Sequence, residues 1–409
     1  MSILMEDYRM KTRLCIITTM FLLLYVIGGV LAQEWIPADT GSKTWDISFS
    51  FRDICFATTD PSKGWVVGDE GTILHSKDGG ATWVEQNSTI KDDLYGVFFL
   101  DANTGWAIGA NNTIIRTTNG SDWSVVMSSP TGRIFRDIYF TDSNHGWVVG
   151  DKNTILYWNG SNWSPRNWNT DQNPNLYGVQ FLDSDTGWGV GDDGTLITTN
   201  DQGVNWEPLL TGVNLRLNKL CFISADTGWI VGDGGTILFK SKNGITSQSS
   251  DGLISLYDVD FINNTTGWTC GTTGQSTVLL NTTNGGASWQ SNTIPYTGST
   301  LYALDFMSKD SGIVVGTGGK IVRFTSTVPK LELNLTEPSG DINILAPTFK
   351  WTTNRSDLTF MIYISNESDP FKKPIYQPIS VTNGISYTLP EEFALTPGEY
   401  YWGIKVDDV

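Results

Sequence analysis

The sequence contains few of the residues that most often bind metals or cross-link chains. It has two histidines and four cysteines in 409 residues. His75 and His145 fall in different segments, so no metal-ligand spacing arises from them. Three cysteines, Cys55, Cys221 and Cys270, lie beyond the apolar N-terminal segment, and an odd, scattered set is not a disulfide framework. We therefore expect no metal centre, no cofactor and no disulfide-stabilised fold.

Positive charge is also scarce. The chain has 26 Lys and Arg against 43 Asp and Glu, which gives a formal net charge of −17. Such a chain repels nucleic acid and anionic lipid headgroups. No glycine-rich loop precedes a predicted helix, so nothing indicates a nucleotide-binding site. These absences exclude nucleic acid as an expected partner.

The sequence does contain a motif that occurs seven times. Gly-Trp pairs begin at Gly64, Gly105, Gly146, Gly187, Gly228 and Gly267, and a degenerate copy begins at Gly312. Successive copies are 41, 41, 41, 41, 39 and 45 residues apart. A nearly constant step of this size is typical of a tandem structural repeat.

Each repeat has four short apolar runs separated by turn residues, the pattern of a four-stranded antiparallel blade. In the second repeat the runs are 94–99, 106–109, 113–117 and 123–126. Gly, Asn and Asp at the corners suit tight turns. A single blade cannot bury both faces, so neighbouring blades must stack. The sequence predicts an all-β fold with a seven-bladed β-propeller over residues 33–326.

The turn after the third run carries a second motif, Ser/Thr-x-Asp/Asn-x-Gly-x-x-Trp or a shortened form of it. Its paired positions are Asp78 and Trp83, Asn119 and Trp123, Asn159 and Trp163, Asp201 and Trp206, and Asn284 and Trp289. This motif resembles the Asp-box, or BNR repeat. We interpret it as structural, because the Asp or Asn oxygen can accept backbone N–H groups while Trp packs into the blade. The alternative is a calcium or sugar site.

Together, the Gly-Trp-x-x-Gly-x-x-Gly-Thr-Ile-Leu motif and the Asp-box resemble the photosynthesis system II assembly factor family. The resemblance covers roughly residues 33 to 326. It implies a seven-bladed propeller and a non-catalytic role in binding or assembling other proteins. The chain lacks an arginine-rich insertion of the kind that would carry a photosystem partner.

Residues 1–32 resemble a signal peptide. Lys11 and Arg13 precede an apolar run that ends at Leu31, and Ala32 completes a small-residue cleavage site. An uncleaved anchor is the alternative. In both cases we expect the propeller outside the cytoplasm, secreted or at the cell surface, with no membrane insertion beyond this segment.

The seventh repeat has three runs and lacks the fourth. Residues 33–37, around Trp35, resemble the fourth run of the fourth repeat, which begins at Trp206. We therefore expect residues near Trp35 to supply the outer strand of the last blade. Joining the two ends in this way removes an open sheet edge.

The repeats stop after Ser326, and residues 327–409 have a different pattern. Alternating runs, Trp351 and the later Tyr401 resemble a fibronectin type III or related Ig-like β-sandwich. The sequence ends soon after Val406, where such a domain has a further strand. We expect that strand to be missing or supplied from elsewhere, or the chain to be truncated.

The candidate binding site is a set of residues at the second position of each inner strand. These residues are Arg52, Tyr95, Arg136, Tyr177, Asn218, Tyr257 and Tyr302. Equivalent positions on seven blades form a ring, so the set is predicted to line one mouth of the central channel. The alternative is that these side chains pack between neighbouring strands. Asp258, Asp260 and Asp305 add an acidic sector, which we interpret as solvated carboxylates.

An enzyme hypothesis arises because sialidases and some endoglucanases carry Asp-boxes on propellers. A sialidase needs three arginines, and a Tyr nucleophile with acidic partners. Arg52, Arg136 and Arg216 could supply the charge, but no glutamate lies on an inner strand. We therefore predict no catalytic residues and a protein that binds other proteins, as an assembly or stability factor or at the cell surface. The alternative is a carbohydrate-active protein that binds or cleaves glycans at the propeller mouth.

Overall fold

The chain divides into two compact units in the computed structural model. One unit is Gln33–Thr325, and the other combines Met1–Ala32 with Ser326–Val409. The structure describes residues 32–41, 46–130, 132–248 and 254–327, and outside these ranges only the backbone of seven strands. Most of the predicted signal peptide therefore lies outside the described residues. In the described part of the chain, no helix is long and apolar enough to cross a membrane.

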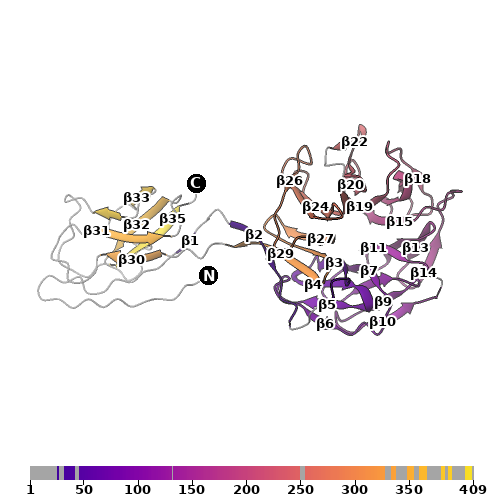
Figure 1. Cartoon of the computed structure of the whole chain (residues 1–409), viewed down its shortest axis with the longest axis horizontal. Coiled ribbons are helices and arrows are strands. Elements are labelled where there is room, and N and C mark those ends of the chain that lie inside the picture. Colours follow the sequence, from indigo (N-terminus) through magenta and orange to yellow (C-terminus); the bar gives the residue numbers. More distant parts are fainter. Residues whose placement is uncertain are drawn as a thin grey trace, which may run out of the picture. The chain divides into compact units, whose positions relative to one another are not determined.

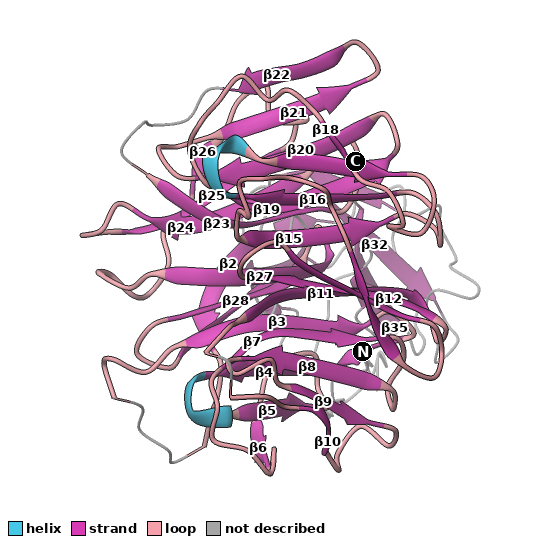
Figure 2. Cartoon of the chain, turned by 90° about the vertical axis from the view of Figure 1, so that its right-hand side faces the viewer, coloured by secondary structure: helices cyan, strands magenta, loops and turns pink. Residues whose placement is uncertain are grey.

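Gln33–Thr325 forms seven four-stranded antiparallel sheets, arranged as blades around a common axis (Figures 1 and 2). The first strand of each blade is innermost. Blade 1 consists of β3 (Phe51–Ala57), β4 (Asp60–Gly68), β5 (Ile73–Ser76) and β6 (Val84–Gln86). Blade 2 consists of β7 (Leu94–Phe99), β8 (Gly105–Gly109), β9 (Ile114–Thr117) and β10 (Ser124–Met127). Blade 3 consists of β11 (Phe135–Asp142), β12 (His145–Gly150), β13 (Thr154–Trp158) and β14 (Trp163–Arg166).

The remaining blades follow the same order. Blade 4 consists of β15 (Leu176–Phe181), β16 (Gly187–Gly191), β17 (Leu196–Thr199) and β18 (Glu207–Pro208). Blade 5 consists of β19 (Leu217–Ser224), β20 (Thr227–Gly232), β21 (Ile237–Ser241) and β22 (Gly244–Gln248). Blade 6 consists of β23 (Ser255–Phe261), β24 (Gly267–Thr272), β25 (Thr277–Thr282) and β26 (Gln290–Ser291). Blade 7 is β27 (Leu301–Ser308), β28 (Ser311–Gly316), β29 (Lys320–Thr327) and β2 (Ala32–Pro37). The predicted seven-bladed propeller is confirmed.

The Gly-Trp motif forms the joint between neighbouring blades. The ring of Phe99 lies against Gly105, where an added Cβ would be 2.5 Å from a ring carbon. Trp65 of the preceding blade stacks on the other face of Phe99, with ring centroids 3.4 Å apart. The same stack recurs in Trp106–Phe140 at 3.9 Å, Trp147–Phe181 at 3.5 Å, Trp188–Phe222 at 4.1 Å, Trp229–Phe261 at 3.5 Å and Trp268–Phe306 at 3.7 Å. Glycine is thus required because the Phe ring occupies the place of a side chain.

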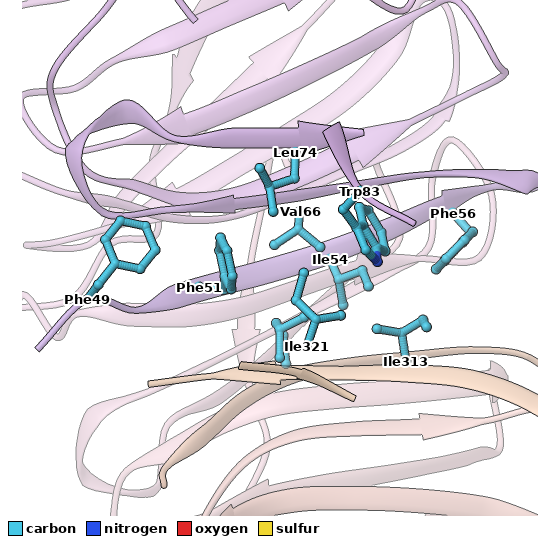
Figure 3. Close-up of a cluster of buried hydrophobic side chains, with 11 residues drawn as sticks. Phe49, Phe51, Ile54, Phe56, Val66, Leu74, Trp83, Ile313 and Ile321 are labelled. Carbon is cyan, nitrogen blue, oxygen red and sulfur yellow. The ribbon is translucent and has the colours of Figure 1, made fainter. Parts of the chain in front are cut away.

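Blade 7 has Ile313 where the other blades have Trp. The joint between blades 7 and 1 therefore has no Trp–Phe stack, and instead Ile313 and Ile321 pack against Phe51, Ile54 and Phe56 (Figure 3). All five side chains are at most 5% exposed. The degenerate motif copy thus lies at the joint where the ring closes.

In five blades, the turn after the third strand is held by side-chain hydrogen bonds. In blade 1, Asp78 Oδ1 accepts the Thr82 N–H at 2.9 Å, and Ser76 Oγ accepts the Gly80 N–H at 2.8 Å. The Trp83 indole N–H donates to Gly80 O at 3.0 Å. Equivalent oxygens on Asn119, Asn159, Asp201 and Asn284 accept backbone N–H groups at 2.8–2.9 Å. Trp83, Trp123 and Trp206 are buried, and Trp163 and Trp289 are half-buried. The Asp and Asn side chains therefore stabilise the turns, and the Trp side chains pack into the blades.

The N-terminal strand closes the ring. β2 is the outer strand of blade 7, next to β29. Trp35 packs on Phe324, with ring centroids 4.7 Å apart. The chain then continues to blade 1, where Asp39 O accepts the Trp83 N–H at 2.8 Å. The predicted closure by residues near Trp35 is confirmed.

The second unit contains two sheets. One has the order β1 (Tyr25–Val26), β35 (Tyr401–Asp407), β32 (Thr359–Ser365), β33 (Ile379–Thr382), and the other β30 (Leu333–Glu337), β31 (Thr348–Thr353), β34 (Ser386–Thr388). The side chains of these strands lie outside the described residues. The fibronectin type III or Ig-like sandwich stays a prediction.

Candidate functional site

Aromatic and guanidinium groups alternate near the start of the inner strands. The Arg52 guanidinium carbon lies 4.8 Å from the ring centroid of Tyr302 and 5.5 Å from that of Tyr95. Arg136 lies 5.5 Å from Tyr95 and 5.4 Å from Tyr177. All five side chains are half-buried. The structure thus brings five of the seven predicted ring residues into a continuous row of cation–π contacts.

Two more contacts extend this row. Tyr257 packs against Tyr302 with ring centroids 5.3 Å apart, and the Arg216 guanidinium carbon lies 5.1 Å from the Tyr177 ring. We name the whole set the collar: Arg52, Tyr95, Arg136, Tyr177, Arg216, Tyr257 and Tyr302.

Asn218 differs from the other predicted ring residues. It is 7% exposed, and its amide donates to Leu256 O at 2.7 Å and to Asp233 Oδ1 at 3.2 Å. The side chain therefore ties blade 5 to blade 6. Its prediction as a mouth-lining residue is corrected, since Arg216 provides the contact of blade 5 with the collar.

Each collar arginine is oriented by an aspartate of its own blade. Arg52 pairs with Asp69 at 2.9 Å, Arg136 with Asp151 at 3.0 Å and Arg216 with Asp233 at 3.2 Å. Each aspartate directly follows the glycine that ends the second strand. A guanidinium has five N–H donors, so one carboxylate leaves donors for an incoming ligand. The aspartates thus fix the arginines without using all their hydrogen-bonding capacity.

A charged layer lies one residue further along the inner strands. The Lys219 ammonium of blade 5 reaches Asp137 of blade 3, at 2.8 Å from Oδ1. Asp53, Asp137 and Asp258 are 8%, 3% and 5% exposed. Burial by itself lowers the pKa of Lys219, but the three carboxylates outweigh it and raise that pKa overall. This layer therefore links blades 1, 3, 5 and 6 electrostatically.

The channel carboxylates bridge neighbouring blades. Asp258 Oδ2 accepts the Leu304 N–H at 2.8 Å, Asp260 Oδ2 the Phe306 N–H at 2.9 Å, and Asp305 Oδ2 the Phe56 N–H at 2.6 Å. Asp53 and Asp137 make the same kind of bond to Val97 and Val179, both at 2.8 Å. The interpretation of the acidic sector as solvated carboxylates is therefore wrong, because these groups are hydrogen-bonded inside the ring.

Burial shifts these carboxyl groups toward the neutral form. It raises the pKa of Asp258 to about 8 and that of Asp305 to about 7. It also raises the pKa of Asp53 and of Asp260 to about 6. A raised pKa is found in catalytic acids, but here each carboxylate has a backbone partner on the next blade. The arrangement supports the ring rather than an acid and nucleophile pair.

His75 and the cysteines offer no further chemistry. Burial lowers the pKa of His75 to about 4, and its ring stacks on Trp65 at 4.7 Å. Burial also raises the pKa of the Cys55, Cys221 and Cys270 thiols, which keeps them protonated. Within the described ranges, no group of three or more His, Cys, Asp or Glu residues could hold a metal ion.

Comparison with known proteins gives one family. The family model described as photosynthesis system II assembly factor YCF48 matches residues 39–131, 120–211, 159–251 and 213–325. Photosystem II assembly protein Ycf48 of Synechococcus sp. (strain JA-3-3Ab) is 46% identical over 44 residues, which are 10% of this chain and 13% of that protein. The curated relative is thus matched over a small part of its length.

Two solved structures share the propeller fold. YCF48 from Cyanidioschyzon merolae has a TM-score of 0.57 and 22% identity, over 72% of this chain and 98% of that one. A structure described as YCF48 bound to D1 peptide has a TM-score of 0.57 and 21% identity, over 71% and 98%.

Proposed function

Since this chain belongs to the photosynthesis system II assembly factor YCF48 family, we propose that it is a non-catalytic propeller that binds a segment of another protein at the collar. Binding there would assist the assembly or stability of that partner. The single observation that carries this proposal is the continuous row of arginine and tyrosine contacts near the start of the inner strands. A peptide is the ligand described for one structural relative, which is bound to a D1 peptide.

The chemistry of the collar suits an extended peptide. Tyrosine rings offer flat apolar faces with a polar tip, and guanidinium groups offer N–H donors for peptide carbonyls and carboxylates. Both side-chain types are frequent among residues that dominate binding energy at interfaces. Aspartate pairing and blade packing hold them in place, so little conformational entropy is lost on binding.

We further propose that the propeller works outside the cytoplasm, at the cell surface or secreted. The basic residues, apolar run and cleavage site of residues 1–32 support this placement. The second unit would then serve as a spacer or adhesive module. N-terminal sequencing of the protein purified from its native host tests the proposal, with cleavage after Ala32 as the expected result.

Peptide selection tests the collar. A phage-displayed peptide library is selected on the purified chain, and enriched peptides and a D1 peptide are titrated by fluorescence anisotropy. We expect Tyr95→Ala combined with Tyr177→Ala to weaken binding at least tenfold, because each of these tyrosines contacts two collar arginines. Tyr296→Ala, which lies outside the collar, is the control and should change affinity less than twofold.

Two results would overturn the proposal. One is the absence of any enriched peptide that depends on the collar tyrosines. The other is turnover of a sialoside or β-glucan by the purified chain, which would favour the carbohydrate-active alternative.

A further inference from the structure

A second concave surface lies between the outer parts of blades 2 and 3. It has a volume of about 670 Å³, within the range of ligand-binding pockets. Two turns, after β8 and after β12, line it, as do residues 167–171 and residue 173. Lys152 lines it and directly follows Asp151, the partner of the collar residue Arg136. The groove therefore borders the collar on the same face of the propeller.

The two turns that line the groove differ from those of the other blades. In blades 1, 4, 5 and 7 the corresponding position is Gly71, Gly194, Gly235 and Gly319, all with positive φ. In blades 2 and 3 it is Asn112 and Asn153, with φ of 54° and 55°. The preceding residues, Asn111 and Lys152, also have positive φ, as do Glu70 and Asp193 in blades 1 and 4, so among the described turns only those of blades 2 and 3 have two successive non-glycine residues in this region. Left-handed backbone at paired non-glycine residues is strained, and such strain often marks functional sites.

At the position of Asn112 and Asn153, the glycines of blades 1 and 4 lie close to the backbone of the following segment. A Cβ at Gly71 would lie 2.6 Å from Ile90 O, and one at Gly194 would lie 1.9 Å from Val213 O. In blades 1 and 4 the segment leading to the next blade therefore leaves no room for a side chain at this position. In blades 2 and 3 the corresponding segments also contact the turn, since Arg133 O accepts the Asn112 N–H at 3.1 Å and Pro174 O accepts the Asn153 N–H at 2.7 Å, but they leave room for the two amide side chains, which line the groove.

Several polar atoms of the groove lack protein partners. Asn112 Oδ1, Asn153 Oδ1 and Arg166 Nε are buried, and none has a hydrogen bond within the described part of the chain. The other end of the Asn153 amide is fixed, since its Nδ2 donates to Trp168 O at 2.7 Å. Buried polar atoms without partners are costly, so a bound molecule that satisfies them gains affinity.

The charge of the groove is opposite to that of the chain. Its charged lining residues are Arg133, Lys152, Arg166 and a single acid, Asp171, whereas acids outnumber bases by 43 to 26 in the whole sequence. The Arg166 guanidinium carbon lies 4.3 Å from the Tyr157 ring centroid, which restrains its orientation. A local positive field on an acidic protein selects anionic ligands.

We propose that this groove binds an acidic, extended peptide segment of the partner that the collar recognises. Arginine and lysine pair with its carboxylates, and the asparagine amides match the donor and acceptor pairs of its peptide groups. This inference rests on the proposed function and adds a second site, with the chemistry of its ligand. Contacts at two adjoining sites would raise affinity through effective concentration.

The test uses a fluorescein-labelled decapeptide of alternating Glu and Leu or Tyr, and the same peptide with Gln in place of every Glu. Binding to the full chain is measured by anisotropy at low and at physiological salt. We expect the acidic peptide to bind at least tenfold more tightly than its Gln form, with weaker binding at the higher salt.

Two variants locate this binding. Lys152→Gln combined with Arg166→Gln should weaken it at least tenfold, whereas the control Lys77→Gln with Lys242→Gln removes two exposed charges from other blades and should change it less than twofold. Asn112→Gly copies the other blades, so it should keep the melting temperature and still weaken binding at least threefold.

The outcomes separate this proposal from the proposed function. Equal binding of the two peptides, equal binding by parent and groove variants, or binding of an acidic oligosaccharide in place of the peptide would overturn the groove proposal. If the groove variants have no effect while Tyr95→Ala with Tyr177→Ala weakens the selected peptides, only the groove proposal fails. If the reverse holds, binding of acidic peptide at the groove stands on its own, whereas the collar proposal and the joint recognition of one partner by both sites are overturned.

Discussion

At the scale of single residues, the missing side chain of glycine determines how blades join. The ring of Phe140 fills the space next to Gly146, and Trp106 stacks on the far side of that ring. The phenyl ring is thus held between a backbone and an indole. A Cβ added at Gly146 must displace the Phe140 ring, which is packed between the Gly146 backbone and the Trp106 indole.

Gly146→Ala should therefore destabilise the propeller by about 1–3 kcal/mol, the usual cost of overpacking. An added Cβ would be 2.3 Å from a Phe140 ring carbon. The control is Gly212→Ala, where φ is 74°, in the left-handed region, and no atom lies within 4 Å of the added Cβ. Strain alone should cost about 1 kcal/mol there. Urea denaturation measures both, and equal losses would contradict the packing argument.

At the scale of elements, the outer strand of blade 7 comes from the opposite end of the propeller sequence. β2 joins β29, and the segment after it reaches the turn before Trp83 of blade 1. A ring closed in this way has no open edge at the joint, so unfolding cannot begin there without breaking β2 away.

Trp35→Ala should lower the free energy of unfolding by about 2–3 kcal/mol, somewhat less than for a fully buried tryptophan. Trp35 is half-buried and packs on Phe324 and Phe306. Val125→Ala, at a half-exposed position on the outer strand β10, is the control and should cost less than about 1 kcal/mol. A Trp35 variant as stable as the Val125 variant would mean that the closure contributes little.

At the scale of the whole molecule, charge is distributed by depth. The exterior is strongly acidic, the channel holds buried carboxylates around Lys219, and the collar and groove present cations. A carboxyl group with a raised pKa binds more protons in the folded state than in the unfolded state. Its contribution to stability is therefore present at low pH and is lost as the pH rises through the folded pKa.

Asp258 gives a measurable case. Its pKa is about 8 in the folded chain against an ordinary value of 3.8, so stability should fall between about pH 4 and pH 8. Asp258→Asn keeps an oxygen acceptor for the Leu304 N–H and removes the ionisation. It should reduce that pH dependence by up to about 4 kcal/mol between pH 5 and pH 8, since each pH unit in this range corresponds to about 1.4 kcal/mol. The exposed-residue variant Asp193→Asn is the control, and thermal melts at pH 5 and pH 8 compare them. An unchanged slope in the Asp258 variant would contradict the assignment.

Several features of the propeller could be predicted from the sequence alone. The period of the Gly-Trp pairs predicted the blades, and the missing fourth run predicted the role of Trp35. The row of Arg52, Tyr95 and Arg136 followed from aligning inner strands. The sequence also contains a partial signal for the collar arginines: the last glycine of the second strand is followed by an aspartate in four blades, at Asp69, Asp151, Asp192 and Asp233, and three of these blades, 1, 3 and 5, carry a collar arginine.

What the sequence alone determined is the repeated local pattern, because turn residues, strand period and the Gly-Trp joint act within one blade or between neighbours. Only the tertiary structure decided which side chains meet across the axis or across a joint between blades. Lys219 contacts Asp137 from two blades away, Asn218 is buried while Arg216 joins the collar, and the groove forms where the segments leading to blades 3 and 4 leave room beside Asn112 and Asn153. These outcomes depend on distances between residues 40 to 80 positions apart, which are fixed only when the ring closes.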